Sequence, residues 1–505
     1  MTPELAHRYI QSLYSHPIEL QEKVLQILIK TAEKTLFGQE HGFSEVKNYL
    51  DYKKHVPVRE YNQLNKYWEL ILKNENNILW PGKPLYLIAT SASTGAPKIL
   101  PGTSDFFQAF TNSIMTMLMQ YIYETDYSLF NGKFMNFTGS MNFKNINTYQ
   151  LGPVSAMLRL NTPDYLAQNM LPSKNTLNLM DSQGWDVMFK QAAKEGTANK
   201  ITVCSGLPSW MIQFFNACLE LSGKQSLSEV LPTLKLLLTS GVNYRPYLAQ
   251  FNDLFNNKIT IREMYGASEG CFAFQESTKH ESMLLNLSNG IYFEFINLDD
   301  NTHNNPKRFN ISEVKPDRPY VMIISTCSGL WSYKMGDIIA FDSILPYRIK
   351  VLGRTNHFIS IQTEHVYTQH VESAIQEVNN YFKIDINNFT VAPNIITENC
   401  MPYHIWYIET PHYHGINLEV LANRLDQALI KNSTGYAKSR ARKSLAEPKV
   451  VLLQPGAFIK FLTTKNNTSL QLKVPKVSND RAIAEFLIKN DLIITSDQQT
   501  KYQLF

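Results

Sequence analysis

The chain reads Thr90-Ser91-Ala92-Ser93-Thr94-Gly95-Ala96-Pro97-Lys98 directly after the apolar run Leu85–Ala89. Four of these nine residues carry a hydroxyl group, and the last one is a lysine. A strand that leads into such a loop directs backbone N–H groups, hydroxyls and a cation toward the same place, as the binding of nucleotide phosphates requires. The spacing is not that of a Walker A loop, and the segment alone fits a polar surface loop equally well.

Length, charge and cysteine content limit the class of protein. At 505 residues the chain is too long for one compact core, and we expect two or three domains. A net charge of +4 is too dilute to indicate nucleic-acid or membrane binding, and the basic run 438–443 is interpreted as a solvated helix face. The five cysteines are scattered without a C-x-x-C pair, which argues against a disulfide framework and a zinc site. The N-terminus does not resemble a secretory signal and no apolar run approaches about 20 residues, so we expect a cytoplasmic protein.

Short apolar runs alternate with helical patterns through the middle of the chain, which predicts an α/β core with largely parallel strand pairing. The predicted strands are Leu85–Ala89, Lys133–Phe137, Ile201–Cys204, Leu234–Leu238 and Ile259–Met264, with helices that include Ser209–Leu221 and Pro246–Phe255. Three later runs lie closer together and predict an antiparallel meander: Ile291–Ile296, Val321–Ser325 and Ile338–Phe341. The first 40 residues predict amphipathic helix with an apolar stripe of Leu20, Val24, Leu25, Ile27 and Leu28.

After Gly353-Arg354 the pattern changes to a small α+β unit. Its predicted elements are a helix over Thr368–Val378, a strand over Tyr403–Glu409, a helix over Leu418–Leu429 and a strand over Val450–Leu453. We therefore predict two domains, residues 1–353 and residues 354–505.

A second segment whose residue types could bind a ligand is Tyr265-Gly266-Ala267-Ser268-Glu269, which follows a predicted strand. An aromatic ring at a strand end can stack on a purine, and the glycine lets a ligand approach the backbone. A carboxylate next to a serine can hold Mg²⁺ through oxygen ligands. The alternative is a tight turn with a helix cap.

Two further glycine-containing pairs complete the set. Gly336-Asp337 opens a predicted strand, where a carboxylate can accept hydrogen bonds from both hydroxyls of a ribose, although Gly-Asp is also common in ordinary turns. Gly353-Arg354 stands at the predicted domain boundary, where a glycine allows rotation and an arginine can pair with phosphate or ribose. The alternative there is a plain turn with a solvated arginine.

These four segments occur in the order found in adenylate-forming enzymes. The chain most resembles the acyl-acid amido synthetases of the auxin-responsive Gretchen Hagen type, from about residue 35 to about residue 478. Five segments outside the nucleotide motifs also resemble that family: Val56–Tyr61, Gly206–Met211, Thr239–Gly241 followed by Tyr247, Tyr292–Ile296 and Leu472–Lys476.

The resemblance implies a two-step reaction that uses ATP and magnesium. A carboxylic acid attacks the α-phosphate to form an acyl-adenylate, and an amine, usually an amino acid, then takes the acyl group and releases AMP. It also implies a large ATP- and acyl-binding adenylation domain over 1–353, with α/β layers and a small β-barrel-like meander, and a smaller mobile α+β domain over 354–505. We expect a monomer that binds neither nucleic acid nor membrane.

The resemblance also implies a role for individual residues. Ser91, Ser93, Thr94 and Lys98 correspond to the phosphate loop, Tyr265 with Gly266 and Ala267 to the adenine site, and Ser268 and Glu269 to the phosphate and magnesium turn. Asp337 corresponds to the ribose-binding aspartate, Arg354 to the hinge arginine, and Lys473 to the C-terminal lysine that reaches the phosphate. Ser155–Leu158, Trp210 and Tyr244 are expected to form walls of the acyl pocket.

Several positions depart from the family pattern. Ala92 stands where the family has glycine, Ser332 and Lys334 replace arginines of the segment before Asp337, and His365 stands where a lysine is common. Two alternatives therefore stay open beside the amido synthetase. One is an acid–thiol ligase that passes the acyl group to coenzyme A, and the other is a catalytically degenerate nucleotide- or acyl-binding protein.

Overall fold

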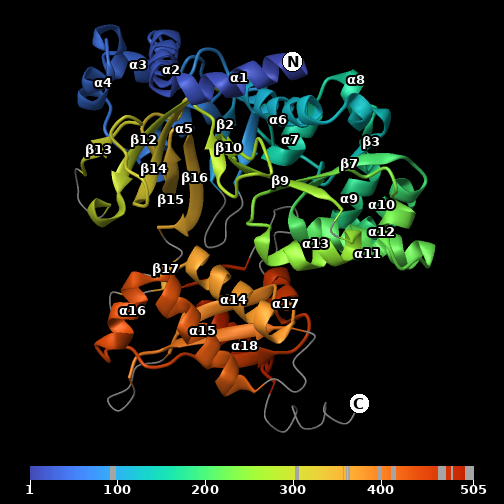
Figure 1. Cartoon of the computed structure of the whole chain (residues 1–505). Helices are drawn as coiled ribbons and strands as arrows, with labels where there is room; N and C mark the ends of the chain where they lie inside the picture. The colour runs from blue at the N-terminus through green and yellow to red at the C-terminus, as the bar shows by residue number, and fades with distance from the viewer. Residues whose placement is uncertain are drawn as a thin grey trace. The chain divides into compact units, whose positions relative to one another are not determined.

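The structure is a computed structural model of the whole chain (Figure 1). It describes residues 1–90, 98–256, 258–301, 306–355, 358–359, 361, 364, 366–394, 401–410, 417–464, 474–478 and 481–494. The chain divides into two compact units, of which the first holds Met1–Tyr244 and Phe251–Lys350. The second begins at Val351 and also includes Arg245–Gln250. The functions expected for residues 1–353 and 354–505 stay predictions.

Three helices open the first unit. Thr2 caps the first of them by accepting a hydrogen bond from the Leu5 amide, and proline occupies the first turn of the first two helices. The predicted apolar stripe is wrong at Ile27, which is 53% exposed because the buried face of its helix runs through Val24 and Leu28. The helices are α1 (Pro3–Ser15), α2 (Pro17–Ala32) and α3 (Leu36–Glu40).

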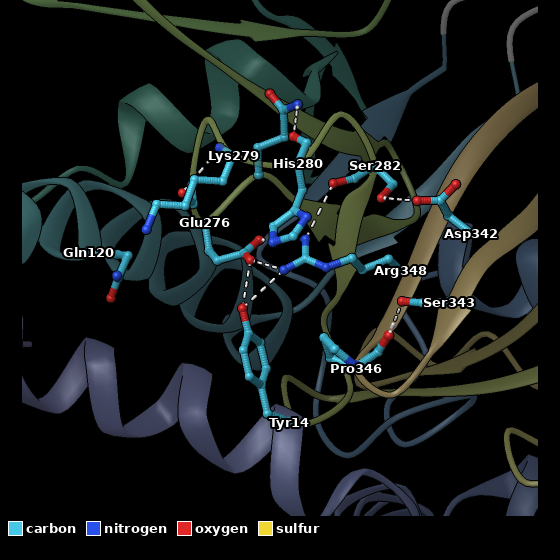
Figure 2. Close-up of polar contacts among 12 residues, drawn as sticks. Tyr14, Gln120, Glu276, Lys279, His280, Ser282, Asp342, Ser343, Pro346 and Arg348 are labelled. Atoms are coloured by element: carbon cyan, nitrogen blue, oxygen red, sulfur yellow. Dashed lines mark hydrogen bonds and ion pairs between the residues drawn. The ribbon is translucent and has the colours of Figure 1, made fainter.

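A polar cluster connects Tyr14 of α1 to the buried Arg348 of the central sheet and to the buried Glu276 (Figure 2). The Tyr14 hydroxyl donates to Glu276 Oε1 at 2.7 Å and accepts from Arg348 at 3.0 Å, and Arg348 also forms an ion pair with Glu276. Burial beside Glu276 raises the pKa of Tyr14, so the phenol stays protonated. The guanidinium and the carboxylate compensate each other, as buried charges must.

A 12-stranded sheet forms the centre of the first unit, in the order β13-β12-β14-β15-β16-β11-β10-β9-β8-β7-β3-β6. Strands β6, β3, β7, β8 and β9 pair in parallel, which confirms the predicted α/β core, and the antiparallel meander continues the same sheet. The strands are β3 (Lys133–Asn136), β6 (Met170–Leu171), β7 (Ile201–Gly206), β8 (Leu236–Ser240), β9 (Thr260–Ala267), β10 (Gly270–Phe274), β11 (Met283–Leu285), β12 (Ile291–Asn297), β13 (Arg308–Phe309), β14 (Pro319–Thr326), β15 (Tyr333–Ile344) and β16 (Tyr347–Arg354).

Helices pack along the parallel strands, with α10 and α11 beside β7 in Figure 1. Helix α11 starts on Pro208 and ends before Gly223, whose φ of 66° gives the left-handed cap that favours glycine. The remaining α-helices of the unit are α4 (Tyr49–His55), α5 (Asn65–Leu72), α6 (Ser104–Glu124), α7 (Val154–Leu160), α8 (Asp164–Ala167), α9 (Lys174–Ser182), α10 (Trp185–Thr197), α11 (Pro208–Ser222) and α12 (Leu227–Val230). Helix α13 (Leu248–Phe255) is divided, because its residues up to Gln250 belong to the second unit and the others to the first.

A separate four-stranded sheet, in the order β2-β1-β5-β4, carries the strand that leads into the hydroxyl-rich loop. Strand β1 pairs antiparallel with β2 and parallel with β5, so it is held on both sides, and Ala89 lies opposite Ile99. The loop therefore leaves and re-enters the fold at neighbouring points. The strands are β1 (Tyr86–Ala89), β2 (Ile99–Gly102), β4 (Lys144–Ile146) and β5 (Tyr149–Pro153).

The second unit is an α+β layer with its own core. Helices α14 and α15 pack on each other, and Trp406, Phe389 and Leu425 are among the side chains buried in this core. Among the described residues, every helix of the chain is too short or too polar to cross a lipid bilayer. The elements are β17 (Phe358–Ile359), β18 (Val366–Tyr367), α14 (Thr368–Phe382), β19 (Asn388–Pro393), β20 (His404–Glu409), α15 (Leu418–Asn432), α16 (Thr434–Ala441), β21 (Lys449–Leu453), α17 (Ala457–Thr463) and α18 (Ala482–Lys489).

Candidate active site

The parallel strands of the large sheet end along one edge. Gly206 at the end of β7 pairs with Thr239, and Ser240 at the end of β8 pairs with Met264 of β9. The segments after these strands therefore lie in a row, and in open α/β sheets ligands bind outside the carboxyl ends of the strands. Tyr265 follows Met264 directly and so belongs to this edge.

Tyr265 and Asp337, predicted separately from the sequence, lie in direct contact. The Tyr265 hydroxyl donates to Asp337 Oδ2 at 2.5 Å, which joins β9 to β15. Asp337 is 7% exposed, and the residue before it, Gly336, has a φ of 85° that a side chain would strain. This glycine therefore lets β15 turn so that the carboxylate meets the tyrosine.

The turn between β9 and β10 holds the other residues of this predicted motif. Gly266 and Ala267 end β9, and Ser268 and Glu269 form the turn itself. A Cβ at Gly266 would lie 2.9 Å from the Phe110 ring, so glycine is needed for close packing of the turn on α6. Glu269 is only 6% exposed and lines a small pocket.

A magnesium ion would find few protein ligands here. The described residues contain no group of three or more His, Cys, Asp or Glu side chains with the spacing of a metal site. Glu269 would supply one carboxylate, which fits Mg²⁺ because this ion usually binds one or two carboxylates together with substrate phosphates.

Lys98 is the one residue of the predicted phosphate loop that lies within the described part of the chain. Its amide donates to Thr90 Oγ1 at 3.0 Å and its carbonyl accepts from the Thr90 amide at 2.9 Å, which closes the base of the loop. Its ammonium group donates to the Tyr333 hydroxyl at 3.2 Å. Ala92 and the predicted phosphate-binding residues Ser91, Ser93 and Thr94 lie outside the described residues.

Strand β15 therefore connects two parts of the predicted site. Its first residue, Tyr333, meets Lys98, and four positions later Asp337 meets Tyr265. The structure thus brings together Lys98, Asp337 and Tyr265, with the Ser268-Glu269 turn directly after Tyr265.

The predicted residues of the second unit are less completely described. Arg354 is the last residue of β16 and is exposed, and Gly353 before it has a φ of 150°, which favours glycine. Lys473 and His365 lie outside the described residues. The roles of Arg354 and Lys473 stay predictions.

The expected walls of the acyl pocket lie in the first unit, where Trp210 is buried. In the segment Ser155–Leu158 the two middle residues are buried and the two outer ones half-buried. Ser155 Oγ accepts from the Gly139 amide at 3.1 Å, and the Trp210 ring packs on Trp185 with 4.8 Å between centroids. Tyr244 is also buried. These contacts are those of a packed core, and the role of Ser155–Leu158, Trp210 and Tyr244 as pocket walls stays a prediction.

The segment Val56–Tyr61 resembles the family, but its residues had no predicted role. In the structure the segment pairs with the start of β15, because the Arg59 amide donates to the Ser332 carbonyl at 3.0 Å and the Lys334 amide donates to the Arg59 carbonyl at 2.8 Å. Nothing in the spacing indicated this contact, since the partners are far apart in the chain.

A buried polar network surrounds Ser332, where the family pattern has arginine. The Ser332 hydroxyl donates to Glu294 at 2.6 Å and accepts from Arg308 at 3.0 Å, and Arg308 pairs with Glu294 at 3.1 Å. The Arg308 guanidinium of β13 thus lies beside Ser332, and it compensates the charge of the buried Glu294 carboxylate.

The fold that holds these residues is that of the adenylate-forming enzymes. The structure resembles the GH3.15 acyl acid amido synthetase, with a TM-score of 0.78 and 15% identity over 98% of this chain and 97% of that one. It also resembles a 2-hydroxyisobutyryl-CoA ligase in complex with its acyl-adenylate, with a TM-score of 0.60 and 13% identity over 95% and 94% of the two chains. Both similarities concern the fold.

The chain belongs to the GH3 family. Residues 6–184 match the GH3 family N-terminal domain, residues 284–354 the central domain and residues 368–482 the C-terminal domain. Among curated relatives, jasmonoyl–L-amino acid synthetase JAR4 of Nicotiana attenuata is 21% identical over 88% of both chains. Jasmonoyl–L-amino acid synthetase GH3.5 of Oryza sativa subsp. japonica is 20% identical over 91% of this chain and 92% of the relative.

These comparisons confirm the family resemblance, the α/β fold with a separate C-terminal unit, and the enzyme class, a ligase. They do not test the individual site residues, which rest on the contacts described above.

Proposed function

We propose that this protein is an ATP-dependent acyl-acid amido synthetase, which adenylates a carboxylic acid and transfers the acyl group to an amine, of which an amino acid is the expected type. Membership in the GH3 family and the adenylate-forming fold support this activity. The observation that carries the proposal is the course of β15, which brings Asp337 to Tyr265 and Tyr333 to Lys98.

In the first step the carboxylate oxygen of the acid attacks the α-phosphorus of ATP. A P–O bond forms, the bond to the β-phosphate breaks, and pyrophosphate leaves. We assign the ribose hydroxyls to Asp337 and the adenine to Tyr265, because a carboxylate can accept from both hydroxyls and a ring can stack on a base. Lys98 compensates phosphate charge, so the residues act by positioning and electrostatic stabilisation.

In the second step the amine attacks the acyl carbonyl. A C–N bond forms, the bond to AMP breaks, and the nitrogen loses a proton, so the products are an amide and AMP. AMP is a far better leaving group than oxide, which is the chemical reason for the first step. We assign Lys473 and Arg354 of the second unit to the phosphate during these steps, on the resemblance to the family.

Glu269 is the residue that would hold magnesium, and the ion would supply positive charge against the triphosphate. The proposal further includes a cytoplasmic monomer without nucleic-acid or membrane partners. Relatives are named for jasmonic acid and for indole-3-acetic acid, and we extend to this chain only the class of substrate, a carboxylic acid.

The test is acid-dependent exchange between ATP and labelled pyrophosphate over a panel of carboxylic acids. Exchange with at least one acid, followed by amide formation with an amino acid detected by mass spectrometry, supports the proposal. Exchange with thioester formation from coenzyme A and no amide would instead identify an acid–thiol ligase. ATP binding without exchange over the whole panel would identify a degenerate binding protein.

A further inference from the structure

The Lys98 ammonium group lies between two tyrosine rings. Its nitrogen is 5.6 Å from the centroid of Tyr61 and 5.7 Å from the centroid of Tyr333, and it donates to the Tyr333 hydroxyl at 3.2 Å. Both distances are within the range of about 6 Å over which a ring face attracts a cation. Tyr61 comes from the segment before the loop and Tyr333 from the first position of β15.

The two rings are themselves held in place. The Tyr61 hydroxyl accepts from the Ile99 amide at 2.9 Å and donates to the Ile99 carbonyl at 3.2 Å, so its ring is fixed to the residue that follows Lys98. The ring also stacks on Trp68 at 5.7 Å between centroids. Tyr61 is therefore rigid relative to the base of the loop.

Tyr333 is fixed from the other side. It is fully buried, and its neighbours Ser332 and Lys334 both form backbone hydrogen bonds with Arg59, two residues before Tyr61. Ser332 has a φ of 42°, and its side chain is held by the buried Glu294. The two tyrosine-containing segments around Lys98 are thus hydrogen-bonded to each other, and both tyrosine rings also contact the lysine.

This surrounding differs from that of two buried arginines in the same unit, each of which pairs with a glutamate. Arg348 pairs with Glu276, as Figure 2 shows, and Arg308 pairs with Glu294. Among the described residues, no carboxylate forms an ion pair with Lys98. Ring faces attract the ammonium group without neutralising it, so its full charge stays available to an anion.

We infer that Tyr61 and Tyr333 are positioning residues, which hold the Lys98 ammonium group at the base of the hydroxyl-rich loop so that it meets the phosphates of ATP. The inference rests on the proposed function, because it takes ATP as the anion. It gives the Val56–Tyr61 segment a role, which is to position the Lys98 ammonium group without neutralising its positive charge.

The test measures the dissociation constant of MgATP by titration calorimetry at fixed ionic strength. Lys98→Met should raise it about 10-fold or more, the loss expected for a charge-assisted contact. Tyr61→Leu removes one ring and Tyr333→Phe removes the hydroxyl acceptor, and each should raise it about 2- to 5-fold. Tyr86→Phe on β1 is the matched control, since its hydroxyl forms no hydrogen bond with any described residue, and it should leave the dissociation constant unchanged.

The deciding measurement repeats both tyrosine substitutions in the Lys98→Met background. If the tyrosines act through the lysine, neither substitution changes ATP affinity further there. Equal losses in both backgrounds, or no loss in the wild-type background, would overturn the inference and leave the proposed function standing. A wild-type chain that binds no ATP would overturn both. Thermal unfolding of each variant separates these results from a general loss of fold.

Discussion

The charged side chain at the candidate site differs from the paired charged side chains in the cores of the two units. At the candidate site of the first unit, the Lys98 ammonium group lies on ring faces and has no described carboxylate beside it. In the core of the second unit, Asp426 accepts from the Tyr436 hydroxyl at 2.6 Å and from Arg440 at 2.8 Å, and Glu364 pairs with His404 at 2.8 Å. Removing one partner of a compensated buried pair destabilises the scaffold, whereas a held charge without an ion-pair partner can bind a ligand.

The largest expected effect is on the stability of the second unit, at its buried Asp426–Arg440 pair. Asp426→Ala removes a fully buried carboxylate that holds both Arg440 and Tyr436. Because an arginine and a phenol then lose their partner, we expect the free energy of unfolding of the second unit to fall by about 3 kcal/mol. Denaturant unfolding measures it.

The matched control is Glu447→Gln, which breaks the more exposed contact of the same Arg440 at 3.4 Å. Such a pair contributes at most about 1 kcal/mol. If the two variants lost equal stability, the buried Asp426 contact would contribute no more to the second unit than the exposed Glu447 contact, contrary to the prediction.

The second prediction concerns ATP binding at the candidate site of the first unit. Asp337→Ala should weaken ATP binding by about 1.5 to 3 kcal/mol, because hydrogen bonds to a charged acceptor are lost. Titration calorimetry measures the affinity. Unchanged affinity would refute the assignment of Asp337 to the ribose.

The third prediction is a pH dependence of the second unit. Burial lowers the pKa of His370 to about 4, and its Nδ1 is placed to accept from the Tyr367 amide at 3.2 Å. Since the unfolded chain binds this proton near pH 6.5, stability should fall as the pH drops from about 6.5 toward 4. Between pH 7 and 5.5 the loss is about 1.2 kcal/mol, measured by unfolding at each pH.

His370→Gln keeps a side-chain acceptor but does not titrate, so it should remove this part of the acid sensitivity. A variant whose stability falls with pH as steeply as that of the wild type would contradict the assignment of this acid sensitivity to His370.

The smallest expected effect concerns ATP affinity at the candidate site. Tyr265→Phe keeps the ring but removes the hydroxyl that donates to Asp337. We expect a loss of about 1 kcal/mol in ATP affinity, the value of one hydrogen bond that orients the carboxylate. The double variant with Asp337→Ala should show no additional loss, and an additive loss would mean that Tyr265 acts independently of Asp337.

Much of the fold followed from local sequence patterns. The predicted strands at Lys133–Phe137, Ile201–Cys204, Leu234–Leu238 and Ile259–Met264 are all present, with ends shifted by a few residues. Boundaries shift because the last residues of a strand depend on the partner strand. Ile27 was misplaced because a run of apolar residues does not say which face of a helix is buried.

The candidate site was predictable only in part. Tyr265 and Asp337 stood out because an aromatic or a carboxylate next to glycine is typical of ligand contacts. Tyr61 and Tyr333 carried no such signal, since tyrosines are frequent in this chain, which has 26 of them. The role of Ser332 was also hidden, because the arginine that reaches it comes from another strand.

The sequence by itself determined the order of the elements, the motifs and the family, because helix and strand periodicity and turn chemistry depend on residues near one another in the chain. Only the tertiary structure decided which side chains meet. Lys98 and Tyr333 are 235 positions apart, and Tyr265 and Asp337 are 72 apart. Such pairs depend on strand register and on the packing of one sheet beside another, and these are properties of the folded chain as a whole.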